Sequence, residues 1–235
     1  MRIGTICYTY KADMSGNTVA LPWIKLSLGG NISVGKTSIQ TRYLIDEFEK
    51  TYQTTIGLDI QKKTVVVKDR NVRVDIWDSA GQERYESMTR QCFREAHGIV
   101  IVFDLTDWAS FSDVNKRWLP KIIDECPKAL RMLIGNKSDL TKSIPDVDIK
   151  LFAEKNEFSY FEVSAKTGDN IQHAFDIFLS AIVDKFQLFE KKMEDKKVVK
   201  LGGTQAISPV PERREDQPLF PRRPPPPQPE SSCEC

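Results

Sequence analysis

Hydrophobic residues are arranged along the chain in two alternating patterns. Short β-rich runs predict strands, and they read WIKLSL from residue 23, GIVIVFD from residue 98, RMLIGNKSD from residue 131 and SYFEVSA from residue 159. The last three runs are apolar enough to be buried on both faces, as strands of a parallel sheet are. Amphipathic segments with helical spacing lie between the runs. The alternation predicts an α/β fold with a doubly wound, mostly parallel sheet, whose ligand site lies at the carboxyl ends of the strands.

Two segments add detail to this fold. Residues 64–78, TVVVKDRNVRVDIWD, contain two strands around a turn at 68–71, which predicts one antiparallel hairpin strand. The strongest helical pattern comes last and is capped by Asp169 or Asn170. Its apolar residues recur at spacings of three and four, and they are Ile171, Ala174, Phe175, Phe178, Leu179, Ile182, Val183 and Phe186.

The two ends of the chain differ from the middle. Residues 1–21 show no hydrophobic period, so we expect a disordered N-terminal extension. Nine of the 13 prolines lie beyond residue 200, which predicts that residues 191–235 form a flexible proline-rich tail. A single folded domain is therefore expected over residues 22–190.

Charge and composition exclude several function classes. The 34 basic residues nearly balance the 33 acidic ones, so no overall field favours nucleic acid as a partner. The longest apolar run is far too short to cross a bilayer. Cys7, Cys92 and Cys126 are scattered without metal-ligand spacing, which favours a reducing compartment. Any membrane attachment is expected to be local.

A glycine-rich motif stands between the first predicted strand and the first helix. Gly30, Gly35, Lys36 and Thr37 have the spacing of a loop whose backbone N–H groups surround phosphates. Lys36 would reach the β- and γ-phosphates, and Thr37 would ligate Mg²⁺. The same loop carries Ile32 and Ser33 at positions where small residues are frequent. Because backbone groups hold the phosphates, binding is expected to survive these two residues.

Three further motifs follow predicted strands. Asp78 opens DSAG and is suited to a water-mediated hold on Mg²⁺, with the Gly81 amide facing a γ-phosphate and Gln82 next in sequence. NKSD contains Asn136, Lys137 and Asp139.

The carboxylate of Asp139 can accept two hydrogen bonds from the edge of guanine, whereas adenine lacks that pair of donors. SAK, residues 164–166, would bring backbone N–H groups to the guanine O6. A P-loop ATPase is an alternative that NKSD disfavours.

The order and spacing of these four motifs resemble a small GTPase of the Ras superfamily, with its P-loop GTPase fold. Within it the chain is similar to the Rab family through TIGLDI at 55–60, WDSAGQERYESM at 77–88, IVFDLTDWASF at 101–111 and two terminal cysteines. SVGKTS together with TYQTTIG is most similar to the Golgi-associated branch. The resemblance covers residues 23–186 and the end of the chain.

The resemblance implies a switch that binds GTP and GDP with Mg²⁺ and hydrolyses GTP slowly. Gln82 would orient the attacking water, and Ile32 would project toward the same space. Residues 50–60 and 78–92 would change order with the γ-phosphate. The metal ligands would be Thr37, Thr55 and Asp78. The nucleotide would contact Gly30, Ser33, Val34, Gly35, Lys36, Thr37, Ser38, Thr55, Gly81, Asn136, Lys137, Asp139, Ser164, Ala165 and Lys166.

The resemblance also implies partners and a location. We expect a monomer that meets an exchange factor, a GTPase-activating protein, a GDP-dissociation inhibitor, a Rab escort protein with geranylgeranyl transferase, and effectors. Cys233 and Cys235 would carry two geranylgeranyl groups, which hold the chain on the cytoplasmic face of Golgi or secretory membranes with a cytosolic pool. A nucleotide-loaded scaffold with negligible hydrolysis stays open, since Gln82 favours a switch and Ile32 favours the scaffold.

Overall fold

The computed structural model describes residues 8–12, 18–48, 57–79 and 86–189 of the chain. Their sheet has the strand order β3-β4-β2-β5-β6-β7, and β1 pairs with β2 outside this path. The strands are β1 (Tyr8–Ala12), β2 (Thr18–Gly29), β3 (Leu58–Val67), β4 (Arg70–Ser79), β5 (Gly98–Asp104), β6 (Leu130–Asn136) and β7 (Phe158–Glu162). The pairs formed by β2, β4, β5, β6 and β7 are parallel, and β3 pairs antiparallel with β4. The predicted sheet is confirmed.

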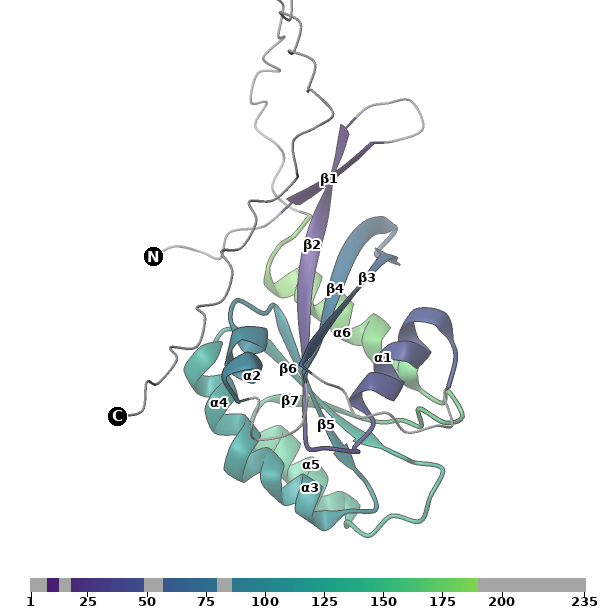
Figure 1. Ribbon diagram of the computed structural model, residues 1–235, viewed down its shortest axis with the longest axis vertical. Coiled ribbons are helices and arrows are strands. Elements are labelled where there is room, and N and C mark those ends of the chain that lie inside the picture. Colours follow the sequence, from purple (N-terminus) through teal and green to yellow (C-terminus); the bar gives the residue numbers. More distant parts are fainter. Residues whose placement is uncertain (1–7, 13–17, 49–56, 80–85, 190–235) are drawn as a thin grey trace, which may run out of the picture. The chain divides into compact units, whose positions relative to one another are not determined.

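Helices cover both faces of this sheet (Figure 1). They are α1 (Lys36–Ile45), α2 (Glu86–Phe93), α3 (Trp108–Asp113), the π-helical turn η2 (Val114–Trp118), α4 (Leu119–Glu125), α5 (Asp146–Lys155) and α6 (Ile171–Lys185). One hydrophobic cluster joins α1 and α6 to one face, and a second joins α2, α3, η2, α4 and α5 to the other. Every residue of β5 is buried between the two clusters, as the apolar run predicts.

The β3–β4 hairpin turns through two residues. Val67 pairs with Arg70, and the connecting residues Lys68 and Asp69 have φ values of 49° and 60°. Positive φ at both central residues matches the twist of the flanking strands. The predicted antiparallel hairpin is therefore present, although neither central residue is a glycine.

The N-terminal segment differs from the expectation of disorder. Residues 8–12 form β1, which pairs antiparallel with residues 18–22 at the start of β2. These two short stretches, YTYKA and TVALP, are rich in aromatic and β-branched residues that favour strands. They are too short to show a period, so the pattern along the chain misses them. The first long strand consequently begins at Thr18 instead of Trp23.

Helix α6 follows its predicted pattern closely. The seven residues from Ile171 to Val183 that were predicted for the apolar face are all buried, and Phe186 is partly buried at the C-terminal end. Asn170 occupies the N-cap position with φ of 60°, but its side chain makes no capping hydrogen bond. Its amide instead donates to the carbonyl oxygen of Glu162 at 2.8 Å. The predicted position is right, and the side chain ties the helix to β7.

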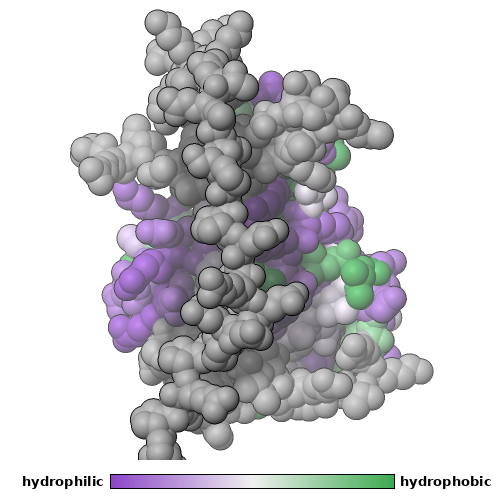
Figure 2. Space-filling view, turned by 45° about the horizontal axis from the view of Figure 1, so that its top comes forward, coloured by the Kyte–Doolittle hydropathy of each residue, from purple (hydrophilic) through white to green (hydrophobic). Residues whose placement is uncertain are grey.

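The described residues that are visible on one face of the molecule are mainly polar (Figure 2). Figure 2 shows a face on which hydrophilic residues predominate and hydrophobic ones gather in a small area. Within these residues no helix is long and apolar enough to span a membrane.

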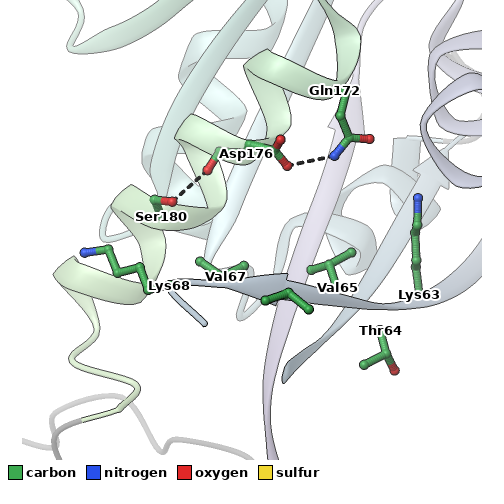
Figure 3. Close-up of a pocket in the computed structure, with 9 residues that line it drawn as sticks. Lys63, Thr64, Val65, Val67, Lys68, Gln172, Asp176 and Ser180 are labelled. Atoms are coloured by element: carbon green, nitrogen blue, oxygen red, sulfur yellow. Dashed lines mark hydrogen bonds between the residues drawn. The ribbon is translucent and has the colours of Figure 1, made fainter. Parts of the chain in front are cut away.

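A groove of about 460 Å³ lies between β3 and α6 (Figure 3). Its lining contains none of the predicted site residues. Asp176 there accepts hydrogen bonds from Gln172 and Ser180 of its own helix, at 2.7 and 2.8 Å.

Candidate nucleotide site

The glycine-rich loop connects β2 to α1. Gly30 has φ of 138°, and a Cβ atom there would lie 2.1 Å from the carbonyl oxygen of Val102. Gly35 has φ of 97°, and a Cβ atom would lie 2.3 Å from the side-chain nitrogen of Asn136. Both positions therefore require glycine, for conformation and for space. The loop reaches the first turn of α1 with its backbone close to two other strand ends.

Ile32 and Ser33 lie at the exposed tip of this loop. The side chain of Ile32 is 47% exposed, so it contributes little to the core. Ser33 has φ of 61°, a conformation that costs a non-glycine residue about 1–2 kcal/mol. The loop keeps its glycine-like path with a serine at this position, and it carries some strain as a result.

Lys36 is buried at the start of α1. Its Nζ donates to the carbonyl oxygens of Gly30 and Asn31 at 2.9 and 2.8 Å, so the ammonium lies inside the curve of the loop. Burial lowers the pKa of Lys36 to about 8, against the opposing effect of the Asp78 carboxylate. A phosphate at this place would provide the negative charge that a buried ammonium lacks.

Thr37 and Asp78 meet as the two predicted metal ligands should. The Thr37 hydroxyl donates to Asp78 Oδ2 at 2.5 Å. Asp78 is fully buried, and its Oδ1 has no hydrogen-bond partner among the residues that the structure describes. Burial raises the pKa of Asp78, while the Thr37 hydrogen bond lowers it. A hydroxyl beside a buried, unpartnered carboxylate oxygen fits Mg²⁺, which prefers oxygen ligands and retains several waters.

Asn136 joins three loops at the end of β6. Its Nδ2 donates to the carbonyl oxygen of Val34 at 2.8 Å, and its Oδ1 accepts the Ala165 N–H at 3.1 Å. The residue is 2% exposed, so both halves of the amide are paired away from water. This single side chain connects the phosphate loop with the NKSD and SAK motifs.

The last two motifs share one carboxylate. Asp139 accepts a hydrogen bond from the Ser164 hydroxyl at 2.7 Å, and Lys166 Nζ lies 3.5 Å from its other oxygen. The Ser164 hydrogen bond holds the pKa of Asp139 below its usual range, with Lys166 as a smaller cause. The carboxylate is therefore ionised and oriented at neutral pH, and 15% of its side-chain surface is exposed.

Lys137 is the second residue of NKSD and has φ of 67°. Its Nζ lies 2.5 Å from Asp104 Oδ2. Asp104 ends β5 and also accepts from the N–H and hydroxyl of Thr106. The ion pair between Lys137 and Asp104 thus also holds the NKSD motif to the end of the neighbouring strand β5.

Several residues that support the site carry no recognisable motif. Arg42 of α1 donates to the carbonyl oxygens of Ala165 and Lys166 at 3.1 and 2.9 Å, which fixes the SAK loop against the helix. Asn31, one residue after Gly30, bonds through its side chain to Asp113 and Trp118. These contacts span more than 80 residues of sequence, and only the position of Asn31 inside the glycine motif pointed to it.

The structure brings together most of the predicted residues. Hydrogen bonds link the phosphate loop, Lys36, Thr37 and Asp78 with one another and, through Asn136, with the NKSD and SAK motifs. Ser38 lies in the first turn of α1, half-buried. Thr55, Gly81, Gln82, Cys233 and Cys235 lie outside the described residues, so their roles stay predictions.

A glycine-lined loop, a buried lysine and a hydroxyl–carboxylate pair at the ends of parallel strands define a P-loop nucleotide-binding protein. The Ras family model matches residues 25–184. The chain is 37% identical to "Ras-related protein Rab-1" of Theileria parva over 164 residues, 68% of this chain and 74% of that protein. It is 39% identical to "GTP-binding protein YPTM2" of Zea mays, with 68% and 80% covered. It is 34% identical to "Ras-related protein Rab-1A" of Dictyostelium discoideum, with 79% and 93% covered. The chain belongs to the Ras family and, within it, to the Rab small GTPases, which are GTP hydrolases of vesicle traffic.

Proposed function

We propose that the chain is a guanine-nucleotide switch of the secretory pathway, which hydrolyses GTP slowly and recruits effectors in the GTP state. The observation that carries the proposal is the oriented Asp139 carboxylate, bound by Ser164 and connected through Asn136 to the phosphate loop. Similarity to relatives named Rab-1 supports the secretory pathway, as does the Golgi-associated resemblance of the loop.

Base recognition follows from the chemistry of Asp139. Its two oxygens accept from the adjacent N–H and NH₂ donors of guanine, and the SAK loop, residues 164–166, would bring backbone N–H groups to O6. Adenine would place an acceptor where the carboxylate requires a donor, so it is rejected. Lys137, tied to Asp104, lies beside the same edge of the site.

At the phosphate end, Lys36 supplies a buried positive charge to the β- and γ-phosphates. Thr37 and Asp78, with Thr55, would hold Mg²⁺, which neutralises phosphate charge when it is bound. Gln82 would orient the attacking water, and Gly81 would donate its N–H to the γ-phosphate. Ser33, Val34 and Ser38 would complete the backbone contacts to the phosphates.

Hydrolysis is expected to be slow, as in this superfamily generally, and Ile32 at the loop tip would slow it further. Members of this superfamily turn over at about 10⁻⁴ s⁻¹ alone and gain about 10⁵-fold from an activator. A further tenfold loss corresponds to only about 1.4 kcal/mol of misplacement. The 47% exposure of Ile32 leaves its side chain free of core contacts, which also favours the second candidate, a GTP-loaded scaffold with negligible hydrolysis.

Membrane attachment is proposed through Cys233 and Cys235. A single lipid gives marginal, reversible binding, so two geranylgeranyl groups would provide stable anchoring. The regulators of such a switch would be an exchange factor, an activating protein and a GDP-dissociation inhibitor. Changing both cysteines to serine should move the protein from the membrane to the cytosolic fraction, and unchanged fractionation would reject this part of the proposal.

Nucleotide competition tests the base site directly. The purified full-length protein should bind GTP more than tenfold tighter than ATP, a difference above about 1.4 kcal/mol. Asp139→Asn should shift the preference toward xanthine nucleotides, because the amide donates to the oxygen that xanthine carries at C2. Asp169→Asn, an exposed change in the neighbouring loop, is the matched control and should keep the preference for guanine. Binding of ATP within tenfold of GTP would refute the assignment.

Single-turnover hydrolysis separates the switch from the scaffold. GTP turnover should rise in Ile32→Gly and fall in Gln82→Leu. A parent protein that keeps GTP intact over many hours, with no gain in Ile32→Gly, would favour the scaffold.

A further inference from the structure

Asn31 lies in the phosphate loop, and both polar ends of its side chain bond to residues of a helical segment distant in sequence. Its Nδ2 donates to Asp113 Oδ2 at 2.7 Å, and its Oδ1 accepts Trp118 Nε1–H at 2.9 Å. A carboxylate only accepts and an indole only donates, so the amide fits in a single orientation. Trp118 is 1% exposed, which excludes water from its side of the contact.

The π-helical turn η2 makes this arrangement possible. Asp113 ends α3 and Trp118 ends η2, five residues later. In a regular α-helix, residues five apart point about 140° away from one another around the axis. In η2 the Leu119 N–H bonds to the carbonyl oxygen of Val114, also five residues back, so the turn is wide enough to bring both side chains to one face. The π-helical turn η2 therefore directs the side chains of Asp113 and Trp118 toward Asn31.

The same residue also holds Lys36. The carbonyl oxygen of Asn31 accepts from Lys36 Nζ at 2.8 Å, so the side chain of Asn31 is fixed to the helix while its main chain is bonded to the ammonium. Two residues further on, Ser33 keeps a positive φ that serine disfavours. A loop under strain needs an external contact to keep one conformation.

We infer that Asn31, Asp113 and Trp118 form a phosphate-loop brace, which positions Lys36 and the loop amides for the β- and γ-phosphates. These are positioning residues that act through Lys36 and the loop, and none is assigned contact with nucleotide. The inference rests on the proposed function, because it assumes that guanine nucleotide occupies this loop.

A positive charge extends the brace. The guanidinium of Arg117 lies 5.0 Å from the centre of the Trp118 ring. The brace therefore includes a cation beside the indole ring of Trp118.

The sharpest test exchanges the carboxylate and the amide. Asn31→Asp alone puts two carboxylates in contact, so GTP dissociation should accelerate and single-turnover hydrolysis should slow, each about tenfold. Asn31→Asp combined with Asp113→Asn restores both hydrogen bonds with the partners reversed. The double variant should therefore recover both rates to within about twofold of the parent. Additive losses in the double variant would overturn the brace.

A second variant removes one hydrogen bond and keeps an aromatic ring in the core. Trp118→Phe keeps an aromatic ring but loses the N–H donor, and we expect GTP dissociation about fivefold faster. Trp108→Phe is the matched control, since Trp108 lies on α3, is 50% exposed and packs edge-on against Phe111 instead of Asn31.

Equal effects of these two phenylalanine variants would overturn the inference. A parent protein that binds no guanine nucleotide would overturn the proposed function and the brace together. GTP binding that is unchanged in Asn31→Asp and in Trp118→Phe would refute the brace alone.

Discussion

Lys25 offers a quantitative test of how the sheet holds α2. It lies on the central strand β2 and is 5% exposed. Its Nζ donates to the carbonyl oxygen of Arg94 at 2.8 Å and to that of Gln91 at 3.5 Å, at the C-terminal end of α2. It also lies 3.8 Å from the centre of the Trp77 ring. We predict that Lys25→Met destabilises the protein and loosens this end of α2.

The magnitude follows from three terms. A hydrogen bond from a charged donor contributes about 1.5–3 kcal/mol, and a desolvated cation–π contact contributes about 2 kcal/mol. Burial opposes them, because it lowers the pKa of Lys25 and disfavours the ammonium. Methionine keeps the length of the side chain and avoids the burial cost. We therefore expect a net loss of about 2–3 kcal/mol in the free energy of unfolding.

Denaturant unfolding of parent and variant measures this loss, and hydrogen exchange shows where it falls. Lys63→Met is the matched control, because Lys63 also donates to a carbonyl oxygen, that of Tyr43 at 2.7 Å, and lies 4.6 Å from the Tyr43 ring centre. Lys63 is only half-buried, so its substitution should cost less than about 1 kcal/mol. If Lys25→Met lost no more stability than Lys63→Met, or left the amide exchange of α2 unchanged, the role of Lys25 in holding α2 would be refuted.

Two further predictions concern pH and loop space. Burial lowers the pKa of His97 to about 4 from 6.5, so between these values the unfolded chain binds a proton that the folded chain does not. The free energy of unfolding should therefore fall by about 3 kcal/mol as the pH falls from 6.5 to 4. His97→Asn should remove this part of the pH dependence, whereas the exposed His173→Asn should retain it, and parallel curves for the two variants would contradict the assignment. Gly30→Ala should destabilise the protein by about 3 kcal/mol, because its Cβ would meet the Val102 carbonyl oxygen at 2.1 Å. A Cβ at Gly57, which has φ of 86°, would meet no atom of the described residues within 4 Å. Thermal unfolding of Gly57→Ala should therefore show a smaller loss, and equal losses would assign the effect to φ alone.

Local patterns were sufficient for much of the fold. The runs that became β5 and β6 and the apolar face of α6 depend on neighbouring residues, so hydrophobic period predicted them. The phosphate loop was also predictable, because its glycines and Lys36 are contiguous. The hairpin of β1 and β2 was missed, since two short strands stabilise each other only once they are paired.

Contacts between distant segments could not be predicted in this way. The Asp78 oxygen that has no partner among the described residues is buried in the folded chain, and a local motif does not specify that burial. The bonds of Asn31 to Asp113 and Trp118 depend on a π-helical turn that has no compositional signal. Motifs thus indicated which chemistry is present, and the fold decided which side chains support it.

The position of Asn136 has a thermodynamic consequence. Its side-chain amide bonds to Val34 of the phosphate loop and to Ala165 of the SAK loop. Displacement of one of these two loops therefore strains the other. A ligand fragment that orders one loop therefore lowers the entropy cost of ordering the other, and the coupling is reciprocal. Guanosine and pyrophosphate, supplied as separate molecules, would each bind more tightly in the presence of the other, with Asn136 transmitting the cooperativity between them.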